Sequence, residues 1–494
     1  MLSDESEGII ELNSKFNSKI GKPYFNNSDK NNVIELSVTP NRPDCLGVRG
    51  IARDLAACDY GDLKDYKKIK FDKKIKHNLK VKIEKDKNQA CYIFGSCIIR
   101  NIKNLESPGW LKNRILALGL RPISAVVDIT NYVMFDLNRP LHAYDLNKIK
   151  NKIIVRNSKK GESFKALDNN SYTLDENMCV IADDEGPLGL GGIIGGTRSG
   201  TEINSENILL ESAYFDPELI RKTAKKLDIN SDAKFRFERG IDPNSVQIGL
   251  EAAAELITSV CGGEASKLDI QQNRKFKSLE FNFDPNLVSK IVGIKVKSNQ
   301  IFKILTKLGF TLKKKGKNFI VKVPTWRPDI FAEIDLVEEV IRIMGLENIK
   351  SIEPEKKRIK PTLNFYQKHF HLAQRSVASK GYFETVTWSF TDENLNNSFK
   401  EELETIKIIN PISSDLNVLR NSLFPNLIFY MKKNSKRGFD NQSLFEIGPV
   451  FIGKKPGEQI TVVCGLKTQI NSEGKLEQLD VFEIKKDLIQ TLTE

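Results

Sequence analysis

The chain has 494 residues, which is too many for one hydrophobic core, so we expect about three or four domains. Hydrophobic residues make up 40% of it and charged residues 28%, as in ordinary soluble globular proteins. The formal net charge is +12, and the lysines are spread along the chain. This charge permits a nucleic-acid partner such as RNA but indicates no sequence specificity.

The seven cysteines do not form a recognisable framework. Their number is odd and no two form a C-x-x-C pair, which argues against zinc knuckles and against a disulfide-stapled fold. No apolar run approaches the roughly 20 residues that span a bilayer, and the first residues, MLSDESEG, do not resemble a signal peptide. We therefore expect a cytoplasmic protein with reduced thiols and no membrane partner.

The first patterned stretch begins with VIELSV (33–38), which predicts a short strand. The segment TPNRPDCLGVRGIARDLAA follows, and its two prolines predict an ordered loop. We expect Asp44 to cap a helix over 46–57. Three arginines of this stretch could contact phosphate or form salt bridges between domains, and the pattern leaves both open: Arg42, Arg49 and Arg53.

After a lysine-dense linker (59–78), the chain predicts strands over 79–83 and 91–99. An amphipathic helix is expected over 107–120, with Ser107 as its cap. The next segment, RPISAVVDITNYVMFDLNRPLHAYD (121–145), is apolar but contains four polar residues. Polar groups in an apolar stretch need partners, so these are either structural hydrogen-bonders or site residues: Asp128, Thr130, Asn131 and His142.

The glycine-rich segment LGLGGIIGGTRSG (188–200) lacks the pattern of a phosphate-binding P-loop. It favours a close approach of the backbone, either to a ligand or to a neighbouring strand. ILLESAYFDP (208–217) predicts a strand that buries Glu211, and a lone buried acid is costly unless it is paired or functional. A helix is expected over 244–261 and ends at two glycines.

Beyond about residue 276 the pattern predicts a small domain with a helix over 298–308 and a strand over 319–323. It closes with PTWRPDIFAEIDLVEEVIRIMG (324–345), which gathers acidic residues in a basic chain. Asp335, Glu338 and Glu339 share one helix face, opposite an apolar stripe. Such a group suits a divalent cation such as magnesium. Helix-dipole complementation, a cap from Asp329 and a Glu338–Arg342 pair explain the same spacing.

The last region, from about 362, begins with a helix over 364–380, followed by strand-like segments. This pattern predicts an α+β domain built on a large antiparallel sheet. The final residues, VFEIKKDLIQTLTE, predict an amphipathic helix. We expect residues 356–360 to be a linker.

Six of these segments, in this order, resemble the β subunit of bacterial phenylalanine–tRNA ligase. They are SVTPNRPDCLGVRGIARDLAA, AVVDITNYVMFDLNRPLHAYD, GGIIGGTRSG, LLESAYFDP, RFERGIDP and PTWRPDIFAEIDLVEEVIRIMG. The resemblance implies an α+β multidomain protein with four parts. These are the end of an N-terminal region (1–60), a B3/B4-type editing domain (81–268), a small winged-helix-like B5 domain (278–353) and an incomplete class II synthetase-like domain (361–494). It also implies truncation at both ends, without most of the N-terminal tRNA-binding module and without the C-terminal anticodon-binding domain.

For function, the resemblance implies a subunit that supports ATP-dependent attachment of phenylalanine to its tRNA, with ATP bound by the α subunit. The expected partners are that α subunit, in an (αβ)2 heterotetramer, and tRNA(Phe), with no DNA. The class II-like domain is expected to have lost aminoacylation chemistry, so Arg420 is assigned to the fold.

The editing domain is expected to hydrolyse mischarged Tyr-tRNA(Phe). By resemblance, its pocket consists of Thr130, Asn131, His142, Gly191, Gly192 and Glu211. Glu211 would hold the phenol, while His142 is either a site residue or a satisfied core histidine. A magnesium ion shared with the α subunit is expected at Asp329, Asp335, Glu338 and Glu339. The rival functions are a non-catalytic RNA-binding scaffold and a stand-alone aminoacyl-tRNA deacylase.

Overall fold

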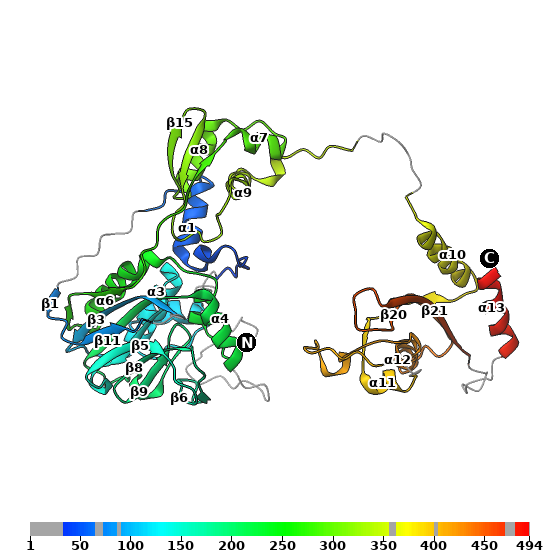
Figure 1. Ribbon diagram of the computed structural model, residues 1–494, viewed down its shortest axis with the longest axis horizontal. Helices are drawn as coiled ribbons and strands as arrows, with labels where there is room; N and C mark the ends of the chain where they lie inside the picture. Colours follow the sequence, from blue (N-terminus) through cyan, green and yellow to red (C-terminus); the bar gives the residue numbers. More distant parts are fainter. Residues whose placement is uncertain are drawn as a thin grey trace, which may run out of the picture. The chain divides into compact units, whose positions relative to one another are not determined.

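The computed structural model describes residues 33–64, 73–85, 90–354, 362–399, 404–469 and 480–493. It divides into two compact units, Met1–Ser351 and Ile352–Glu494, which are described separately (Figure 1). The predicted linker over 356–360 and the first 32 residues lie outside the described residues. Among the described residues, no helix is both long and apolar enough to cross a membrane.

The first unit is built on a six-stranded sheet in which β3 pairs with β11, β12 and β13. Its strand order is β1 (Lys73–Ile75), β12 (Glu264–Ser266), β3 (Cys91–Arg100), β11 (Ile208–Phe215) and β4 (Leu141–Asp145), with β13 (Asp269–Gln272) also on β3. The strands β3 and β11 are buried along most of their length. Their sequences are mostly apolar, as is typical of strands covered on both faces, with Glu211 of β11 as an acidic exception.

A second, five-stranded sheet covers one face of the first. Its order is β10 (Ile194–Gly195), β9 (Gly186–Leu190), β8 (Cys179–Asp183), β5 (Lys152–Asn157) and β2 (Lys80–Ile83), beside a hairpin of β6 (Ser163–Lys165) and β7 (Ser171–Thr173). Leu209 and Ala213 of β11 share a core with this sheet. Because side chains alternate along a strand, Glu211 between them faces the second sheet as well.

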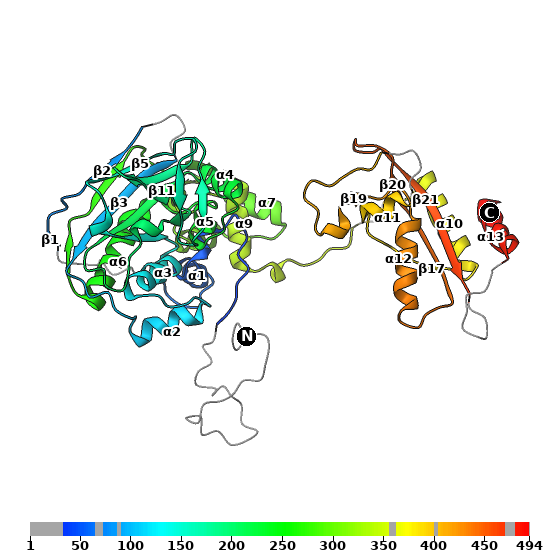
Figure 2. The same cartoon turned by 90° about the horizontal axis from the view of Figure 1, so that it is seen from below.

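Helices cover the opposite face of the first sheet, where Leu210 of β11 packs among them. These helices are α2 (Gly109–Ala117), α3 (Ala125–Leu137) and α6 (Val246–Cys261). Two further helices, α4 (Pro217–Leu227) and α5 (Asp232–Phe237), follow β11 in the chain. Figure 1 shows α3 and α6, then β3 and β11, then β5, β8 and β9 as successive layers. Figure 2 shows α2 beside α3. The cavity described below lies between the two sheets.

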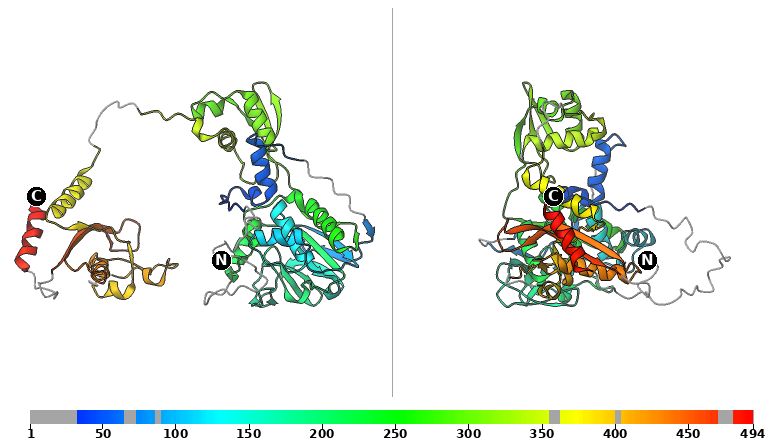
Figure 3. Two further views of the ribbon diagram at one scale, coloured as in Figure 1. Left: turned by 180° about the vertical axis from the view of Figure 1, so that it is seen from behind. Right: turned by 90° about the vertical axis from the view of Figure 1, so that its right-hand side faces the viewer.

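The rest of the first unit is a small α/β body. Its sheet has the order β14 (Glu280–Phe283), β16 (Asn318–Lys322) and β15 (Thr311–Lys315), with α7 (Asn286–Val292), α8 (Ser298–Lys307) and α9 (Glu333–Met344). The strand and helix predicted here are present within one residue. The helix α1 (Val48–Ala57) contacts both α3 and α8 (Figure 3). Its last residue, Ala57, lies in the core of the small body.

Three local predictions, one strand and two helix caps, are wrong. Residues 33–38 form no strand, although they are described. Asp44 does not cap α1, which begins at Val48 after a short 3-10 turn; its carboxylate accepts hydrogen bonds from Arg42 and Arg53 instead. Ser107 does not cap α2, because its hydroxyl donates to Asp128 of α3 at 2.5 Å. Side-chain partners therefore replace the expected caps, nearby arginines at Asp44 and a residue of another helix at Ser107.

The second unit has a three-stranded sheet of β17 (Phe383–Glu384), β20 (Gln442–Phe451) and β21 (Gln459–Thr468). Its other elements are α10 (Phe365–Ser379), β18 (Phe390–Thr391), α11 (Glu393–Asn397), β19 (Val418–Leu419), α12 (Phe424–Ser435) and α13 (Val481–Thr493). The strands β20 and β21 are antiparallel, but β17 runs parallel to β20. The sheet is therefore mixed, which corrects the expectation of a large antiparallel one.

Candidate functional site

A cavity of about 100 Å³ lies between the two sheets of the first unit. Its wall includes Pro140, Leu141, His142, Tyr144, Ile181, Gly189, Leu190, Gly192, Ile193, Ile194, Gly195, Glu211, Phe215, Ala233 and Phe237. The wall is apolar and aromatic except for three side chains, those of Glu211, Tyr144 and His142. The volume is of the same order as the roughly 150 Å³ of a protein cavity that accepts benzene. The cavity is therefore suited to one aromatic ring.

The three polar side chains meet because of the strand register. Glu211 of β11 lies directly opposite His142 of β4, and Tyr144 follows two residues later on the same face. The Tyr144 hydroxyl donates to Oε2 of Glu211 at 2.5 Å. Among the described residues, Oε1 of Glu211 has no hydrogen-bond partner. One carboxylate oxygen is therefore held, and the other is free for a ligand.

Burial controls how these groups ionise. It raises the pKa of Glu211 to about 7, and the hydrogen bond from Tyr144 offsets part of that rise. Burial, reinforced by the Glu211 charge, raises the pKa of Tyr144 well above its usual range, so this hydroxyl stays a donor. Burial lowers the pKa of His142 to about 4, so its imidazole is neutral near pH 7. The pKa of Glu211 thus lies near neutral pH, as is typical of carboxylates at binding and catalytic sites.

His142 has an unsatisfied atom at this site. Its Nε2 is buried and has no hydrogen-bond partner among the described residues. Its ring stands edge-on to Tyr144, with centroids 4.5 Å apart. Buried polar atoms are normally hydrogen-bonded, so Nε2 is able to bond a water or ligand atom at the cavity. This favours the interpretation of His142 as a site residue over that of a satisfied core histidine.

The glycine-rich segment packs closely against the side chains of the cavity wall. A Cβ on Gly191 would lie 2.7 Å from Phe215, and one on Gly192, whose φ is +71°, would lie 2.8 Å from the same ring. A Cβ on Gly195 would lie 2.5 Å from Cε1 of His142. These glycines let the backbone approach aromatic rings of the protein itself, and any contact with a ligand ring stays a prediction.

Thr130 and Asn131 are not brought into this cavity. Both lie on α3, whose buried residues Val126 and Ile129 pack on the helix-covered face of the first sheet. The Thr130 hydroxyl donates to the carbonyl oxygen of Val127 at 2.7 Å. Neither residue is among those that line the cavity. Their predicted place around the ester stays a prediction.

Sequence reasoning missed Tyr144, Phe215 and Phe237, which complete the wall. The signal for Tyr144 was its position two residues after His142, since residues i and i+2 of a strand share a face. Phe215 lies two residues after Ala213 on β11 and therefore shares its face. No local sequence pattern, however, distinguishes a residue that lines a cavity from one in the core. Phe237 comes from α5, and only the tertiary fold brings it there.

The acidic helix α9 forms a different kind of site. Asp329 receives two hydrogen bonds from Arg327, each 2.8 Å long. Glu339 is buried and accepts from Arg327 at 2.5 Å and from Arg342 at 2.7 Å. Asp335 accepts from two backbone N–H groups at the start of α9, while Glu338 is exposed. The predicted Glu338–Arg342 pair is replaced by Glu339–Arg342.

The four acids do not fit a single magnesium centre in this arrangement. Among the described residues, one set of three acidic, cysteine or histidine side chains has its ligand atoms within 4.8 Å of one another, and it is Asp44, Cys45 and Asp54. Asp329 and Glu339 already have arginines as counter-ions, and Asp335 caps the helix. Magnesium binding by the predicted set would require these contacts to change.

Two arginines of the α1 segment, Arg42 and Arg53, form salt bridges within the first unit. Arg42 bonds Asp44 and Asp54, and Arg342 of α9 reaches Asp54 at 2.6 Å. Of the two interpretations left open, salt bridging between segments is therefore present for Arg42. Arg53 bonds Asp44 and lies over the Trp326 ring, 4.4 Å from its centroid.

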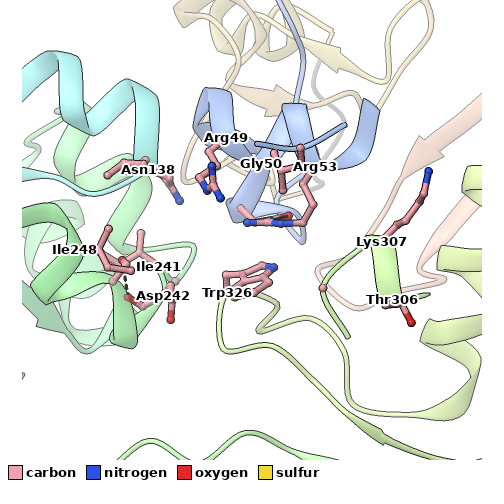
Figure 4. A pocket seen from close by; sticks show the side chains of 16 residues that line it. Arg49, Gly50, Arg53, Asn138, Ile241, Asp242, Ile248, Thr306, Lys307 and Trp326 are labelled. Carbon is pink, nitrogen blue, oxygen red and sulfur yellow. Dashed lines mark hydrogen bonds and ion pairs between the residues drawn. The ribbon is translucent and has the colours of Figure 1, made fainter. Parts of the chain in front are cut away.

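A larger cavity of about 420 Å³ adjoins Arg53 and Trp326 (Figure 4). It lies where α1 meets α3, α6 and the small body. Its charged side chains are engaged with protein atoms, since Arg53 bonds Asp44 and Lys307 bonds the carbonyl oxygen of Ala56 and Asp59. We regard it as a junction between segments, and the smaller cavity as the candidate site.

Three protein-family models match this chain. The B3/4 domain matches residues 90–262, which carry the candidate cavity. The tRNA synthetase B5 domain matches 281–346, and the phenylalanyl tRNA synthetase beta chain CLM domain matches 349–494. The bounds predicted for the domains stay predictions.

Curated relatives agree with these matches. The phenylalanine–tRNA ligase beta subunit of Paramagnetospirillum magneticum is 41% identical over 99% of this chain, and that of Bartonella henselae is 39% identical over 99%. The chain is a homologue of the phenylalanine–tRNA ligase beta subunits. It spans 62% of the length of both relatives. An N-terminal fragment of the phenylalanyl-tRNA synthetase beta-subunit from Pyrococcus horikoshii is 17% identical, covering 63% of this chain and 86% of that one with a TM-score of 0.36.

The homology to phenylalanine–tRNA ligase beta subunits covers Arg420 as well. Arg420 is buried, bonds Glu446 at 2.6 Å and donates to the carbonyl oxygen of Pro449. It also reaches the Thr387 hydroxyl at 2.9 Å. These contacts tie β20 to the segments before β18 and after β19. They support the assignment of Arg420 to the fold of the beta chain CLM domain.

Proposed function

We propose that this chain acts as the beta subunit of a phenylalanine–tRNA ligase and hydrolyses tyrosine wrongly attached to tRNA(Phe). The homology supports the first part. The observation that carries the second is Glu211, a buried carboxylate in an aromatic cavity with Oε2 bound and Oε1 without a partner.

Selection by the hydroxyl group is the reason for a second site. Phenylalanine and tyrosine differ by one hydroxyl, and an apolar pocket rejects an added hydroxyl only about a hundredfold. A buried polar group reverses the preference, because it would stay unpaired against phenylalanine. Glu211 is such a group: its Oε1 would accept the phenol hydroxyl while the ring lies among Phe215, Phe237 and Ile193.

The hydrolysis itself needs a placed water molecule. Water attacks the ester carbonyl carbon, the bond to the terminal ribose oxygen breaks, and tyrosine and a ribose hydroxyl are released. Neutral His142, with Nε2 unpartnered at the cavity, would hydrogen-bond that water or the ester. Thr130 and Asn131 lie on α3 outside the cavity wall, so their role at the ribose rests on the family resemblance alone.

The proposed partners follow from the family. The α subunit would bind ATP and phenylalanine and perform the aminoacylation, in an (αβ)2 assembly on tRNA(Phe). A magnesium site at Asp329, Asp335, Glu338 and Glu339 would form only after Asp329 and Glu339 exchange their arginine contacts for the ion.

The test is clearance of Tyr-tRNA(Phe) by the full chain, alone and with an α subunit. Wild type should deacylate Tyr-tRNA(Phe) and spare Phe-tRNA(Phe), and Glu211→Ala should lose the clearance. Glu218→Ala is a matched control, because Glu218 is an exposed acid on α4 whose side chain pairs with Lys222, outside the cavity. If the α subunit has no effect on clearance, the result favours a stand-alone deacylase. If the chain binds tRNA but does not clear the ester, the result favours an RNA-binding scaffold.

A further inference from the structure

Tyr144 is the one side chain that bonds Glu211 among the described residues, and neither family matches nor sequence patterns assign it a role. It is 1% exposed, and Glu211 is 6% exposed. Tyr144 is positioned from two sides, by the β4–β11 register and by a bridge to Gly200. Its hydroxyl therefore meets Oε2 from a fixed direction.

We infer that Tyr144 is the positioning residue that engages Oε2 of Glu211 and leaves Oε1 alone to accept a hydroxyl from an aromatic substrate. This rests on the proposed editing function, and it adds a determinant of specificity to it. A carboxylate with both oxygens free could turn its plane or bind two waters. With one oxygen held by a buried donor, the second has one direction left, toward the cavity.

The Tyr144 bond also selects the charge state that recognises a hydroxyl. An ionised carboxylate only accepts, so it pairs with a substrate that donates. A protonated carboxyl group carries its own donor and loses that selectivity. The bond from Tyr144 favours the ionised form, against burial, which favours the protonated one.

Among the described residues, the other titratable groups that interact with Glu211 or lie opposite it are neutral near pH 7. Cys91 of β3 and Cys179 of β8 interact with its charge, and burial raises the pKa of Cys179 to about 12 and that of Cys91 well above its usual range. His142 opposite Glu211 has its pKa lowered to about 4 by burial. A titration of the site between pH 5 and 9 therefore reports Glu211.

The first experiment measures that titration in the full chain, by carboxyl carbon NMR on ¹³C-labelled glutamate, with Glu211→Gln to assign the signal. Tyr144→Phe should raise the midpoint by about one pH unit or more, since a hydrogen bond to a charged group contributes about 1.5–3 kcal/mol. Tyr92→Phe is the matched control, because the Tyr92 hydroxyl bonds Asp216, outside the cavity. An unmoved or lowered midpoint in Tyr144→Phe would overturn the inference.

The second experiment compares clearance of Tyr-tRNA(Phe) and Phe-tRNA(Phe) across that pH range. Tyr144→Phe should lower the preference for the tyrosyl ester about tenfold near pH 7, and the pH at which preference is half-maximal should rise with the Glu211 midpoint. An unchanged preference and profile would overturn the inference. If no variant clears either ester, the proposed function fails, while the titration still decides whether Tyr144 holds Glu211.

A third measurement tests the inference without the Tyr144→Phe variant, in case that variant folds poorly. Replacing all tyrosines of the wild-type chain with a fluorinated tyrosine makes the hydroxyl a stronger donor without removing it. The Glu211 midpoint should then fall, the opposite direction to Tyr144→Phe. The same replacement in Tyr92→Phe should give the same fall. A midpoint that does not fall would contradict a Tyr144 bond to Glu211.

Discussion

Arg327 and Glu339 form a buried ion pair, with Nη1 of the arginine 2.5 Å from Oε2 of the glutamate. Burial opposes the charge on Glu339, but the hydrogen bonds from Arg327 and Arg342 outweigh it and lower its pKa to about 2. Because Arg342 also binds Asp54, the pair belongs to the network that joins α9 to α1. The acids of this segment thus act first as structural partners of arginines.

Removing Glu339 should destabilise the first unit. We expect Glu339→Ala to lower the free energy of unfolding by about 3–5 kcal/mol, because it leaves buried arginine charge without its counter-ion. Urea unfolding would measure the loss. The control is Glu338→Ala, an exposed neighbour on the same helix, which should change stability by no more than about 0.5 kcal/mol. Equal effects of the two variants would contradict the structural role of the pair.

Glu211 should make stability depend on pH in a defined window. Its folded pKa of about 7 lies above the ordinary value of 4.5, so the folded state holds the proton more tightly than the unfolded state. The stability from that proton is fully present below about pH 4.5 and is lost as pH rises to 7. Two and a half pKa units correspond to roughly 3 kcal/mol.

Glu211→Gln removes this dependence, so its stability relative to wild type should rise by roughly 3 kcal/mol between pH 4.5 and pH 7 and then level off. Unfolding curves at several pH values would measure it. Glu218→Gln serves as the exposed control. A relative stability of Glu211→Gln that is flat with pH would mean that Glu211 is not the desolvated acid described above.

Gly195 should be needed for the cavity but not for the fold. Its added Cβ would lie 2.5 Å from Cε1 of His142, so Gly195→Ala must push the imidazole out of its place. We expect Tyr-tRNA(Phe) clearance to fall about 10- to 100-fold, since displacements near 1 Å cost that much when they disturb a reacting geometry. Gly109→Ala is the control, because no heavy atom lies within 4 Å of its Cβ position. Full clearance by Gly195→Ala would argue against a role of His142.

Magnesium should have little effect on the chain by itself. Its predicted ligands Asp329 and Glu339 are occupied by Arg327 and Arg342, so we expect the same melting temperature with EDTA and with millimolar Mg²⁺. A resident ion at a hundred times its Kd would add about 2.7 kcal/mol. Stabilisation of that size in the free chain would show that the acids bind magnesium without a partner. Sodium chloride at the same ionic strength is the control for general screening, because Na⁺ binds carboxylates weakly.

Burial of Glu211 was predictable from sequence, because the apolar residues around it in ILLESAYF indicate a strand without a solvent face. Its partner was not, since Tyr144 lies 67 residues away and joins it through the register of β4 on β11. The helix caps failed for a related reason. Asp44 and Ser107 are residue types that often cap helices. The Asp44 carboxylate instead accepts hydrogen bonds from Arg42, and the Ser107 hydroxyl donates to the distant Asp128.

The sequence by itself determined the order and type of most elements, the burial of Glu211 and the kinship with phenylalanine–tRNA ligase beta subunits. These depend on periodicity and on motifs, which are local in the chain. The tertiary structure decided which charges neutralise one another at Asp329 and Glu339, that Thr130 lies away from the cavity, and that Tyr144 holds Glu211. Such choices depend on distances between segments far apart in the chain, and only packing of the two sheets and their helices sets those distances.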